Sequence, residues 1–469
     1  AAKETCEKLD RSLPLMVSMT FEANGRTFTG CSVPSMAAVI EGLGANFIGF
    51  NCSLGPVELL PLAKELVSCT YLPVFIKANA GLPDPQTNLY SISAEEFACC
   101  MKEYLSLGIR VFGGCCGTDP EFIREMTKML SGKHPVKASV PARRSCVCTP
   151  TDFVPVDRVR IIGERINPTG KKRLKQAILE QDFDYILSQG ISQVEAGASI
   201  LDVNMGMNGI DEKEMMLKAV NELTMVSNLP LSIDSSYVDV VEAALRIYPG
   251  RALINSISLE PEKFEKLIPI AKKYGAMFIL LPLSEKGLPE NLDEKKEIIH
   301  TIYEEAKRHG LCGEDIVVDG LVATIGANRN AAIETLETIR YCKHELGLAT
   351  ACGLSNISFG LPERLFVNSS FMALAIGQGL TMAIANPSQD LLMHAVFAAD
   401  LLMNKPDADL RYINRVSEHK ISVVSGEVDA VQTTTKKSGS GSKDLIPPEH
   451  EGDKIFEAVV KGRKNKIET

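Results

Sequence analysis

Short apolar runs alternate with helix-length amphipathic segments between about residues 153 and 405. The runs read RIIGE, ILDVN, LSID, ALINS, MFILLPL, DIVVDG, ATACGLS and TMAIANP. Strands of a parallel sheet that is covered on both faces are nearly continuous apolar runs, and helical crossovers connect them. Eight such units over roughly 250 residues predict an α/β fold with a complete (β/α)8 TIM barrel.

The same alternation occurs only four times between residues 13 and 130, in LMVSMTF, NFIGFNCS, PVFIKANA and IRVFGGCC. Four units do not close a barrel and leave strand edges unpaired. We interpret this region as a partial (β/α) barrel, the second half of one whose first half is not in this chain. A four-stranded open sheet is the structural alternative.

Composition changes mark the boundaries between these regions. A stretch rich in Pro, Ser and basic residues, SGKHPVKASVPARRSCVCTPTDFVP, has the composition of a linker, and TTTKKSGSGSKDLIPPEHEG reads as a polar tether. We predict a half barrel (1–134), a linker (135–157), a full barrel (158–405), a polar tail with a flexible linker (406–452) and the start of a truncated helical domain (453–469).

Polar residues end nearly every predicted strand of the full barrel. Active sites of TIM barrels lie at the carboxyl ends of the strands, so these residues predict a polar rim around an active site. For any single position, a helix N-cap is the alternative interpretation. The rim residues are Glu164, Asp202, Asn204, Asp234, Asn255, Asp319, Asn356 and Asn386.

Charge and hydropathy exclude several function classes. The formal net charge is −9, so no basic excess is present to neutralise the phosphates of a nucleic acid. The chain shows no signal peptide and no apolar run of the roughly 18 residues that a membrane span needs. We therefore expect a cytoplasmic protein with neither a nucleic-acid nor a membrane partner.

Three cysteines end predicted strands of the short block. Cys52 follows one strand, and Cys115 and Cys116 follow another within the sequence GGCCGT. The flanking glycines permit a sharp bend that aims two neighbouring sulfurs at one point. Three converging thiolates with one open position would suit catalytic zinc, and buried structural cysteines are the alternative. A Cys146-Val-Cys148 pair in the predicted linker has no standard metal-site spacing.

A basic segment follows the first strand of the full barrel. GERINPTG, at 163–170, departs from a phosphate-binding loop in its glycine spacing and in the residues after it. The following KKRLK is either a solvated helix face or a group that steers an anionic substrate tail.

The cysteine block resembles the homocysteine-binding domain of zinc-dependent homocysteine methyltransferases. The resemblance rests on NCSLGP, then NAG, then GGCCGT. It implies that Cys52, Cys115 and Cys116 are the zinc ligands and that a homocysteine thiol is the nucleophile activated there.

The full barrel resembles the folate-binding domain of cobalamin-dependent methionine synthases and of the related methyltetrahydrofolate:corrinoid methyltransferases. The resemblance rests on the order GERIN, LDVN, IDSS, NSIS, VVDG and GLSNISFGLPER. It implies a pterin site formed by Glu164, Asn167, Asp202, Asp234, Asn255, Asp319, Asn356 and Arg364.

Together, the resemblances imply a methyltransferase of methionine synthesis. Methyl would move from 5-methyltetrahydrofolate to cob(I)alamin, and from methylcobalamin to zinc-activated homocysteine. We expect Asn356 to follow the pterin N5 atom as donor or acceptor, supported by Asp202 and Asp234 as the other catalytic residues. No His has an Asp two residues before it, so the corrinoid motif D-x-H-x-x-G is absent. The cobalamin would be bound by a domain in cis or in trans.

Two other functions remain open, and a third is disfavoured. The chain would be a methyltetrahydrofolate:corrinoid methyltransferase with a different acceptor, or a folate-binding fragment without catalysis. A condensation of the dihydropteroate synthase type would leave the cysteine block without a role.

Overall fold

The computed structural model describes residues 1–87, 89–90, 92–136 and 140–418, which belong to one structural unit. The predicted truncated helical domain (453–469) and most of the predicted flexible linker lie outside these residues. In the described part, no helix combines the length and the apolar character that a membrane span requires.

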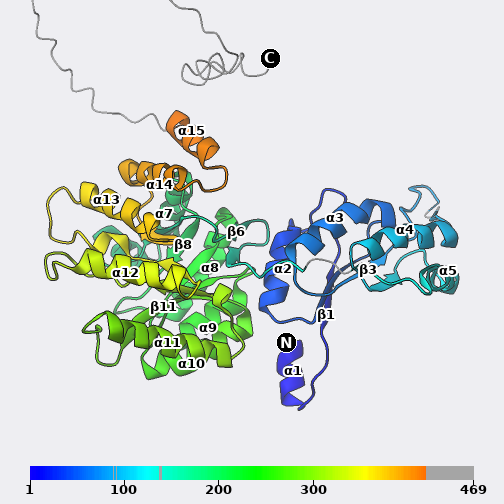
Figure 1. Cartoon of the computed structure of the whole chain (residues 1–469), viewed down its shortest axis with the longest axis horizontal. Coiled ribbons are helices and arrows are strands. Elements are labelled where there is room, and N and C mark those ends of the chain that lie inside the picture. Colours follow the sequence, from blue (N-terminus) through cyan, green and yellow to red (C-terminus); the bar gives the residue numbers. More distant parts are fainter. Residues whose placement is uncertain (88, 91, 137–139, 419–469) are drawn as a thin grey trace, which may run out of the picture. The chain divides into compact units, whose positions relative to one another are not determined.

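An eight-stranded parallel sheet forms the larger region, as predicted (Figure 1). The strand order is β13-β12-β11-β10-β9-β8-β7-β14. A backbone bridge between Gly353 and Ile384, and a 2.9 Å hydrogen bond from the Ile384 amide to the Cys352 carbonyl, join the last strand pair and close the ring. The strands are β7 (Arg160–Ile166), β8 (Ile200–Val203), β9 (Leu231–Asp234), β10 (Leu253–Leu259), β11 (Met277–Ser284), β12 (Ile316–Asp319), β13 (Ala349–Ala351) and β14 (Met382–Ala385).

Helices connect these strands in the order that a TIM barrel requires. Their amphipathic faces bury aliphatic side chains against the outer surface of the sheet, in one continuous apolar cluster over β8 to β12 and a second over β13 and β14. The helices are α6 (Lys172–Glu180), α7 (Phe183–Glu195), α8 (Glu212–Val226), α9 (Val238–Ile247), α10 (Pro261–Tyr274), α11 (Leu292–Arg308), α12 (Ala331–His344), α13 (Arg364–Gly377) and α14 (Asp390–Leu402), with 3-10 turns η1 (Gly313–Asp315) and η2 (Leu354–Asn356).

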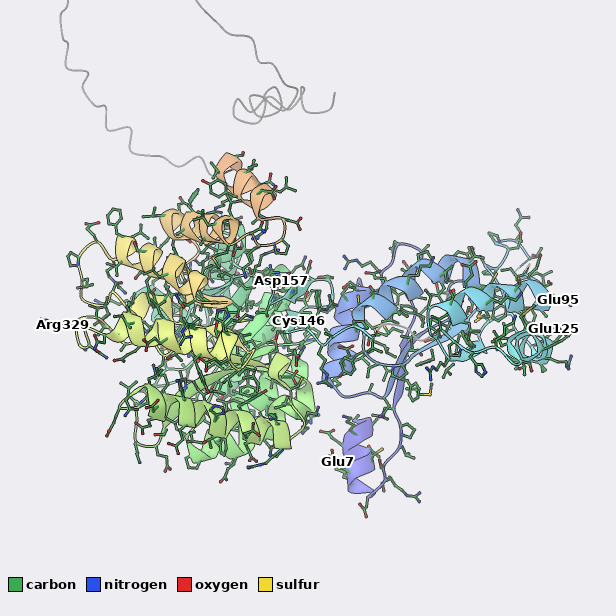
Figure 2. The ribbon with its side chains drawn as sticks, viewed as in Figure 1. Glu7, Glu95, Glu125, Cys146, Asp157 and Arg329 are labelled. Carbon is green, nitrogen blue, oxygen red and sulfur yellow. The ribbon has the colours of Figure 1, made fainter. Side chains whose placement is uncertain are left out.

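A short antiparallel hairpin covers the N-terminal end of the barrel. Strands β5 (Cys146–Cys148) and β6 (Phe153–Pro155) form it, within the stretch that composition predicts to be a linker. Val147 is fully buried among side chains from the first residues of several barrel strands. Cys146 and Cys148 are also buried, and Figure 2 shows Cys146 on this hairpin. The two cysteines therefore belong to the packed base of the barrel.

A buried arginine of the barrel, Arg251, fastens the hairpin to the barrel. The Arg251 guanidinium lies 2.5 Å from Asp315 and 3.4 Å from the Cys146 sulfur. The Cys148 amide also donates to the Arg251 carbonyl at 3.0 Å. The ion pair with Asp315 holds the Arg251 side chain in place, and the hydrogen bonds of Arg251 to Cys146 and Cys148 attach the hairpin to it.

The N-terminal region is a four-stranded parallel sheet of order β1-β2-β3-β4. This partial barrel has its own apolar core, which includes Ile48, Phe50 and Ile76 from the strands. Its elements are β1 (Met16–Met19), β2 (Phe47–Asn51), β3 (Val74–Ala78), β4 (Val111–Gly114), α2 (Val33–Gly42), α3 (Pro56–Cys69), α4 (Ala94–Ser106) and α5 (Pro120–Leu130).

Two of the helices in the described part of the chain lie outside both barrels. Helix α1 (Ala2–Lys8) precedes β1, and helix α15 (Ala408–Glu418) follows α14. The second helix lies where composition predicts a polar tail (406–452), so that prediction is wrong for residues 408–418. Arg411 on α15 forms a 2.9 Å ion pair with the buried Asp400 of α14, a long-range contact that local composition does not reveal.

Candidate functional site

The partial barrel brings its three predicted site cysteines together. The sulfurs of Cys52, Cys115 and Cys116 all lie within 4.8 Å of one another, and those of Cys52 and Cys116 are 3.3 Å apart. Four thiolates around zinc at about 2.3 Å would be about 3.8 Å apart from one another. The cluster therefore has the donor type and spacing that a tetrahedral zinc site uses, with room for a fourth ligand.

Backbone contacts at the strand ends place these sulfurs. The Cys52 amide donates to the Lys77 carbonyl at 3.0 Å, and the Cys115 amide donates to the Ala78 carbonyl at 2.8 Å. Cys52 and Ser53 both adopt left-handed conformations, with φ of 62° and 63°. Non-glycine residues rarely adopt this conformation, and such strain is concentrated at functional positions.

The three glycines around the cysteine pair have different roles. Only Gly117 has a positive φ, at 78°, and a Cβ there would lie 2.4 Å from the Tyr90 ring. A Cβ on Gly114 would lie 2.2 Å from the Thr118 hydroxyl, so this glycine makes room for a neighbouring side chain. The bend therefore depends on the left-handed conformation of Gly117 and on the close approach of Gly114 to Thr118.

The cysteines perturb one another electrostatically. A hydrogen bond from the Cys116 thiol lowers the pKa of Cys52. Burial, followed by the neighbouring Cys52, raises the pKa of Cys115 to about 11. One thiol of the cluster is thus easier to ionise than another, as expected for closely spaced groups that cannot all carry charge without a cation.

Asn79 also belongs to this cluster, although the sequence analysis did not select it. Its side-chain oxygen accepts a 3.1 Å hydrogen bond from the Cys116 amide, and its side chain also hydrogen-bonds Cys52. The signal was the NAG motif, which places an amide at the end of the strand between the two cysteine-bearing strands.

The full barrel places a buried acid pair at its rim. Asp202 is the penultimate residue of β8 and is 2% exposed, and Asp234 ends the neighbouring strand β9. The two carboxyl groups hydrogen-bond each other. Burial raises the pKa of both, and the charge of Asp234 raises the pKa of Asp202 further. The pair therefore favours holding a proton, with Asp202 the more easily protonated member.

Amide and hydroxyl side chains surround this pair. Ser232 and Asn255 donate to Asp202 Oδ1 at 2.7 Å and 3.1 Å, and Asn167 donates to Asp234 Oδ2 at 3.2 Å. Asn204 also hydrogen-bonds Asp234. Five predicted site or rim residues thus form one hydrogen-bonded group, to which the structure adds Ser232: Asn167, Asp202, Asn204, Asp234 and Asn255.

Asp319 stands at the end of β12, across the rim. Its side chain accepts a 2.7 Å hydrogen bond from the Leu321 amide, and burial raises the pKa of Asp319 to about 6. The carboxylate is thus ionised near neutral pH and available to accept hydrogen bonds.

Asn356, Glu164 and Arg364 gather on a third part of the rim. Asn356 ends the η2 turn, and the preceding Ser355 donates to Glu164 at 3.3 Å. Burial raises the pKa of Glu164. Arg364 donates to the Ser355 carbonyl at 2.6 Å and to the Ser358 hydroxyl at 3.0 Å. Its guanidinium therefore holds the turn that carries Asn356.

Lys171 is the first residue of the basic segment and points back to the end of β7. Its ammonium donates to the Glu164 and Asn167 carbonyls at 3.0 Å and 3.1 Å. This lysine therefore supports two rim residues, a role that neither predicted alternative for the segment included.

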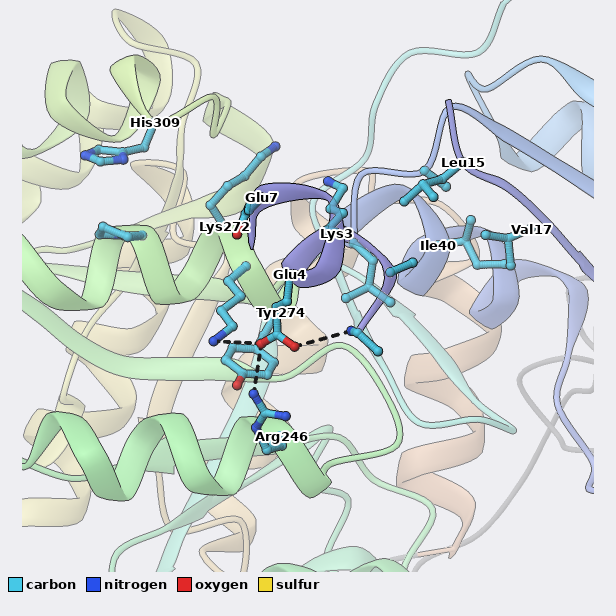
Figure 3. Close-up of a pocket in the computed structure, with 16 residues that line it drawn as sticks. Lys3, Glu4, Glu7, Leu15, Val17, Ile40, Arg246, Lys272, Tyr274 and His309 are labelled. Atoms are coloured by element: carbon cyan, nitrogen blue, oxygen red, sulfur yellow. Dashed lines mark hydrogen bonds and ion pairs between the residues drawn. The ribbon is translucent and has the colours of Figure 1, made fainter. Parts of the chain in front are cut away.

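A cavity of about 660 Å³ lies elsewhere, beside helix α1 (Figure 3). Its lining contains none of the predicted site residues. Glu4 forms ion pairs there with Arg246 at 3.0 Å and Lys273 at 3.1 Å. These cations already have a carboxylate partner, so the cavity is a weaker candidate site than the rim.

Two family models match the chain. Residues 1–130 match the model of homocysteine S-methyltransferases, and residues 163–386 match the model of pterin-binding enzymes. The boundaries agree with the partial barrel and with the full barrel that carries the acid pair.

Two curated relatives match both regions together. The methionine synthase of Mycobacterium leprae (strain TN) is 30% identical over 414 residues, which cover 82% of this chain and 34% of that protein. The methionine synthase of Mycobacterium tuberculosis (strain ATCC 25618 / H37Rv) is 30% identical over 413 residues, covering 84% and 35% respectively. The chain thus spans about a third of the length of these relatives.

Among solved structures, the dihydropteroate synthase of Yersinia pestis aligns with 56% of this chain and 100% of its own. The TM-score is 0.44 and the sequence identity is 16%. The assignment of the fold rests instead on the strand order and the barrel closure described above.

Proposed function

This chain is a relative of the methionine synthases, and we propose that it contains the methyl-donor site and the zinc-carrying half of the homocysteine site of such an enzyme. The overall reaction would move a methyl group from 5-methyltetrahydrofolate to homocysteine. A corrinoid bound by another domain, in cis or in trans, would carry the methyl group between the two sites.

The observation that supports the donor site best is the hydrogen-bonded group around Asp202 and Asp234. One edge of a pterin ring presents N–H and amino donors, and its other ring atoms include a carbonyl and basic nitrogens. Carboxylates bind the donors, and amide side chains such as that of Asn255 bind either kind of group. Asp319 would supply a further ionised acceptor from across the rim. The proposed pterin site comprises these residues together with Glu164, Asn167, Asn356 and Arg364.

The chemistry of methyl removal requires a proton at the pterin. The methyl group leaves N5 without the electrons of the C–N bond, which remain on nitrogen, and N5 then takes a proton to give tetrahydrofolate. Asn356 would hydrogen-bond N5 throughout, since an amide offers both a donor and an acceptor. The buried Asp202–Asp234 pair would keep a proton within the same network.

The cysteine cluster supports the second half of the proposal. Cys52, Cys115 and Cys116 would hold zinc, with the fourth position left for the substrate thiol. When bound, zinc would lower the pKa of the homocysteine thiol, so that the thiolate nucleophile exists at neutral pH. The three cysteines would also fix the position of that thiolate relative to the methyl donor.

Methyl transfer to free cob(I)alamin tests the donor site directly. We expect the purified 469-residue chain, given 5-methyltetrahydrofolate under anaerobic conditions, to consume cob(I)alamin and form tetrahydrofolate. Asp234→Asn should lose most of this activity, because it removes one member of the acid pair. Asp184→Asn makes the same atomic change at an exposed position on α7 and should retain activity.

The rival functions predict other results. Tight binding of methyltetrahydrofolate without transfer by the wild-type chain would favour a folate-binding fragment and contradict the proposal. Transfer to cob(I)alamin that never yields methionine, even with a zinc-loaded chain, homocysteine and a corrinoid domain, would favour a different methyl acceptor.

A further inference from the structure

The turn that carries Asn356 is attached to helix α13 through one arginine. Arg364 is the first residue of α13, and two of its nitrogens reach back to the turn. One donates to the Ser355 carbonyl at 2.6 Å, and the other donates to the Ser358 hydroxyl at 3.0 Å. Asn356 lies between these two attachment points in sequence, so the guanidinium bridges across it.

Ser358 connects Arg364 to the buried side chain of Asn368. It is fully buried, and its hydroxyl donates to Asn368 Oδ1 at 2.7 Å while it accepts from Arg364. Asn368 lies one turn further along α13 and is 3% exposed. A buried hydroxyl that both donates and accepts a hydrogen bond has little freedom to rotate. Ser358 is therefore the most constrained member of this group.

The opposite side of the turn is held by other elements. Ser355 donates to Glu164 of β7 at 3.3 Å. The Ile325 amide donates to the Ile357 carbonyl at 3.1 Å. The exposed Asn356 thus lies between two residues, Ser355 and Ile357, that hydrogen-bond to other elements.

We propose that Arg364, Ser358 and Asn368 form a positioning group that fixes the Asn356 amide for its hydrogen bond to the pterin N5 atom. The inference rests on the proposed function, and it assigns Arg364 to the support of the turn. Among the described residues, Ser358 and Asn368 have no direct hydrogen bond to a rim acid, so we assign their effect to the turn that carries Asn356.

Such support matters for rate more than for binding. Catalytic groups need placement to within about 0.5 Å, and a small displacement costs rate even when the substrate still binds. The pterin ring would retain Asp202, Asp234, Asn255 and Asp319 if the Asn356 turn became loose. Loss of the positioning group should therefore slow methyl transfer and leave the affinity for methyltetrahydrofolate nearly unchanged.

Helix α13 offers a matched control. Ser369 is the neighbour of Asn368 and is 7% exposed, but its buried hydroxyl has no hydrogen-bond partner among the described residues. Ser358→Ala and Ser369→Ala therefore remove the same atom from two buried positions, and only the first breaks the proposed group.

The experiment compares these two variants with the wild-type chain. The single-turnover rate of methyl transfer to cob(I)alamin should fall about tenfold in Ser358→Ala, the factor expected for one lost hydrogen bond. The dissociation constant of methyltetrahydrofolate should change less than about twofold, within the scatter of such contributions. Ser369→Ala should leave both quantities at the wild-type level.

Amide hydrogen exchange of residues 353–361 provides a readout that needs no activity. Exchange there should accelerate in Ser358→Ala and stay unchanged in Ser369→Ala. If the wild-type chain transfers no methyl, the proposed function fails, and the exchange comparison still decides whether the group holds the turn.

Two results would overturn the inference. One is a Ser358→Ala variant that matches Ser369→Ala in rate and in exchange. The other is a loss of methyltetrahydrofolate affinity as large as the loss of rate, which would assign the group to substrate binding.

Discussion

The hydroxyl of Ser232 lies 2.7 Å from Oδ1 of Asp202 and donates a hydrogen bond to it. Both residues are buried, and they come from the neighbouring strands β9 and β8. The two residues are also paired in strand register, so the contact is set by the backbone of the sheet. Ser232 stabilises the charged form of Asp202 and partly offsets the effect of burial on its pKa.

Removing this hydroxyl should loosen the acid pair. We expect Ser232→Ala to lower the free energy of unfolding by about 1–2 kcal/mol, because a buried carboxyl oxygen loses a donor. Urea unfolding measures this change, and methyltetrahydrofolate binding should weaken in parallel. Ser236→Ala, at an exposed position in the following loop, is the control. Equal stability of the two variants would contradict the role given to Ser232.

Asp319 should set the acid limit of pterin binding. The pKa of its carboxyl is raised to about 6, so the group becomes protonated as the pH falls below 6. A protonated carboxyl no longer accepts two donors, and we expect methyltetrahydrofolate affinity to fall between about pH 7 and pH 5. Titration calorimetry across this range measures the effect. An affinity independent of pH would exclude Asp319 as an ionised ligand.

The same group should cost stability at neutral pH. Its folded-state pKa lies above the ordinary value of 3.8, so the folded protein binds this proton more tightly than the unfolded chain does. Stability from this group is therefore greatest at low pH and is lost as the pH rises from about 4 to about 6. Asp319→Asn should be more stable than wild type at pH 7 by up to about 3 kcal/mol, at the expense of pterin binding. Lower stability of this variant at pH 7 would contradict the assignment.

Zinc content should depend on the cysteine cluster alone. We expect about one zinc per chain after purification and its loss in Cys115→Ser, because two sulfurs do not complete the site. Cys99→Ser changes an exposed cysteine outside the cluster and should retain the metal. Elemental analysis gives the ratio directly. Zinc retained by Cys115→Ser would place the metal on other residues.

Gly117→Ala should damage the same site through the backbone. A Cβ at this position meets the Tyr90 ring at 2.4 Å and also disfavours the positive φ of 78°. We expect reduced zinc affinity, because the turn that holds Cys116 must move. Gly132→Ala is a control with a similar φ of 70° and no atom within 4 Å of the added Cβ. Gly132→Ala should lose about 1 kcal/mol of stability, Gly117→Ala should lose more because of the ring contact, and only Gly117→Ala should lose metal. Equal zinc affinity in the two variants would show that the Tyr90 contact is unimportant.

The strands and their rim residues were predictable because parallel strands leave a strong one-dimensional signal. Each is a nearly unbroken apolar run, and a polar residue such as Asp234 marks its end. The proximity of Cys52 to Cys115 and Cys116 was also predictable from the strand pattern. All three follow predicted strands, and the carboxyl ends of parallel strands lie at one edge of the sheet.

The hairpin at Cys146–Cys148 was not predictable in this way. It has three residues per strand, and its surroundings are rich in proline, serine and basic residues. Val147 is buried because the open end of a barrel lies beneath it, and no local pattern describes that environment. Helix α15 was missed for a similar reason, because its contact with Asp400 is a tertiary one.

The side chains that hold the site residues in place could not be predicted from the sequence. Lys171 lies in a basic run that resembles a solvated face, yet it donates to two carbonyls at the end of β7. Ser358 and Asn368 are ordinary polar residues whose pairing depends on the path of a loop. Such roles depend on distances between segments, which residue type and spacing do not specify.

The hairpin that carries Val147 covers the N-terminal end of the barrel. With the base filled, the interior opens toward the strand carboxyl ends, where the acid pair and Asn356 lie. In the proposed reaction, folate and the methyl acceptor would both enter and leave at this carboxyl end of the strands. Both molecules would therefore have to share the space around the same ring of strand ends.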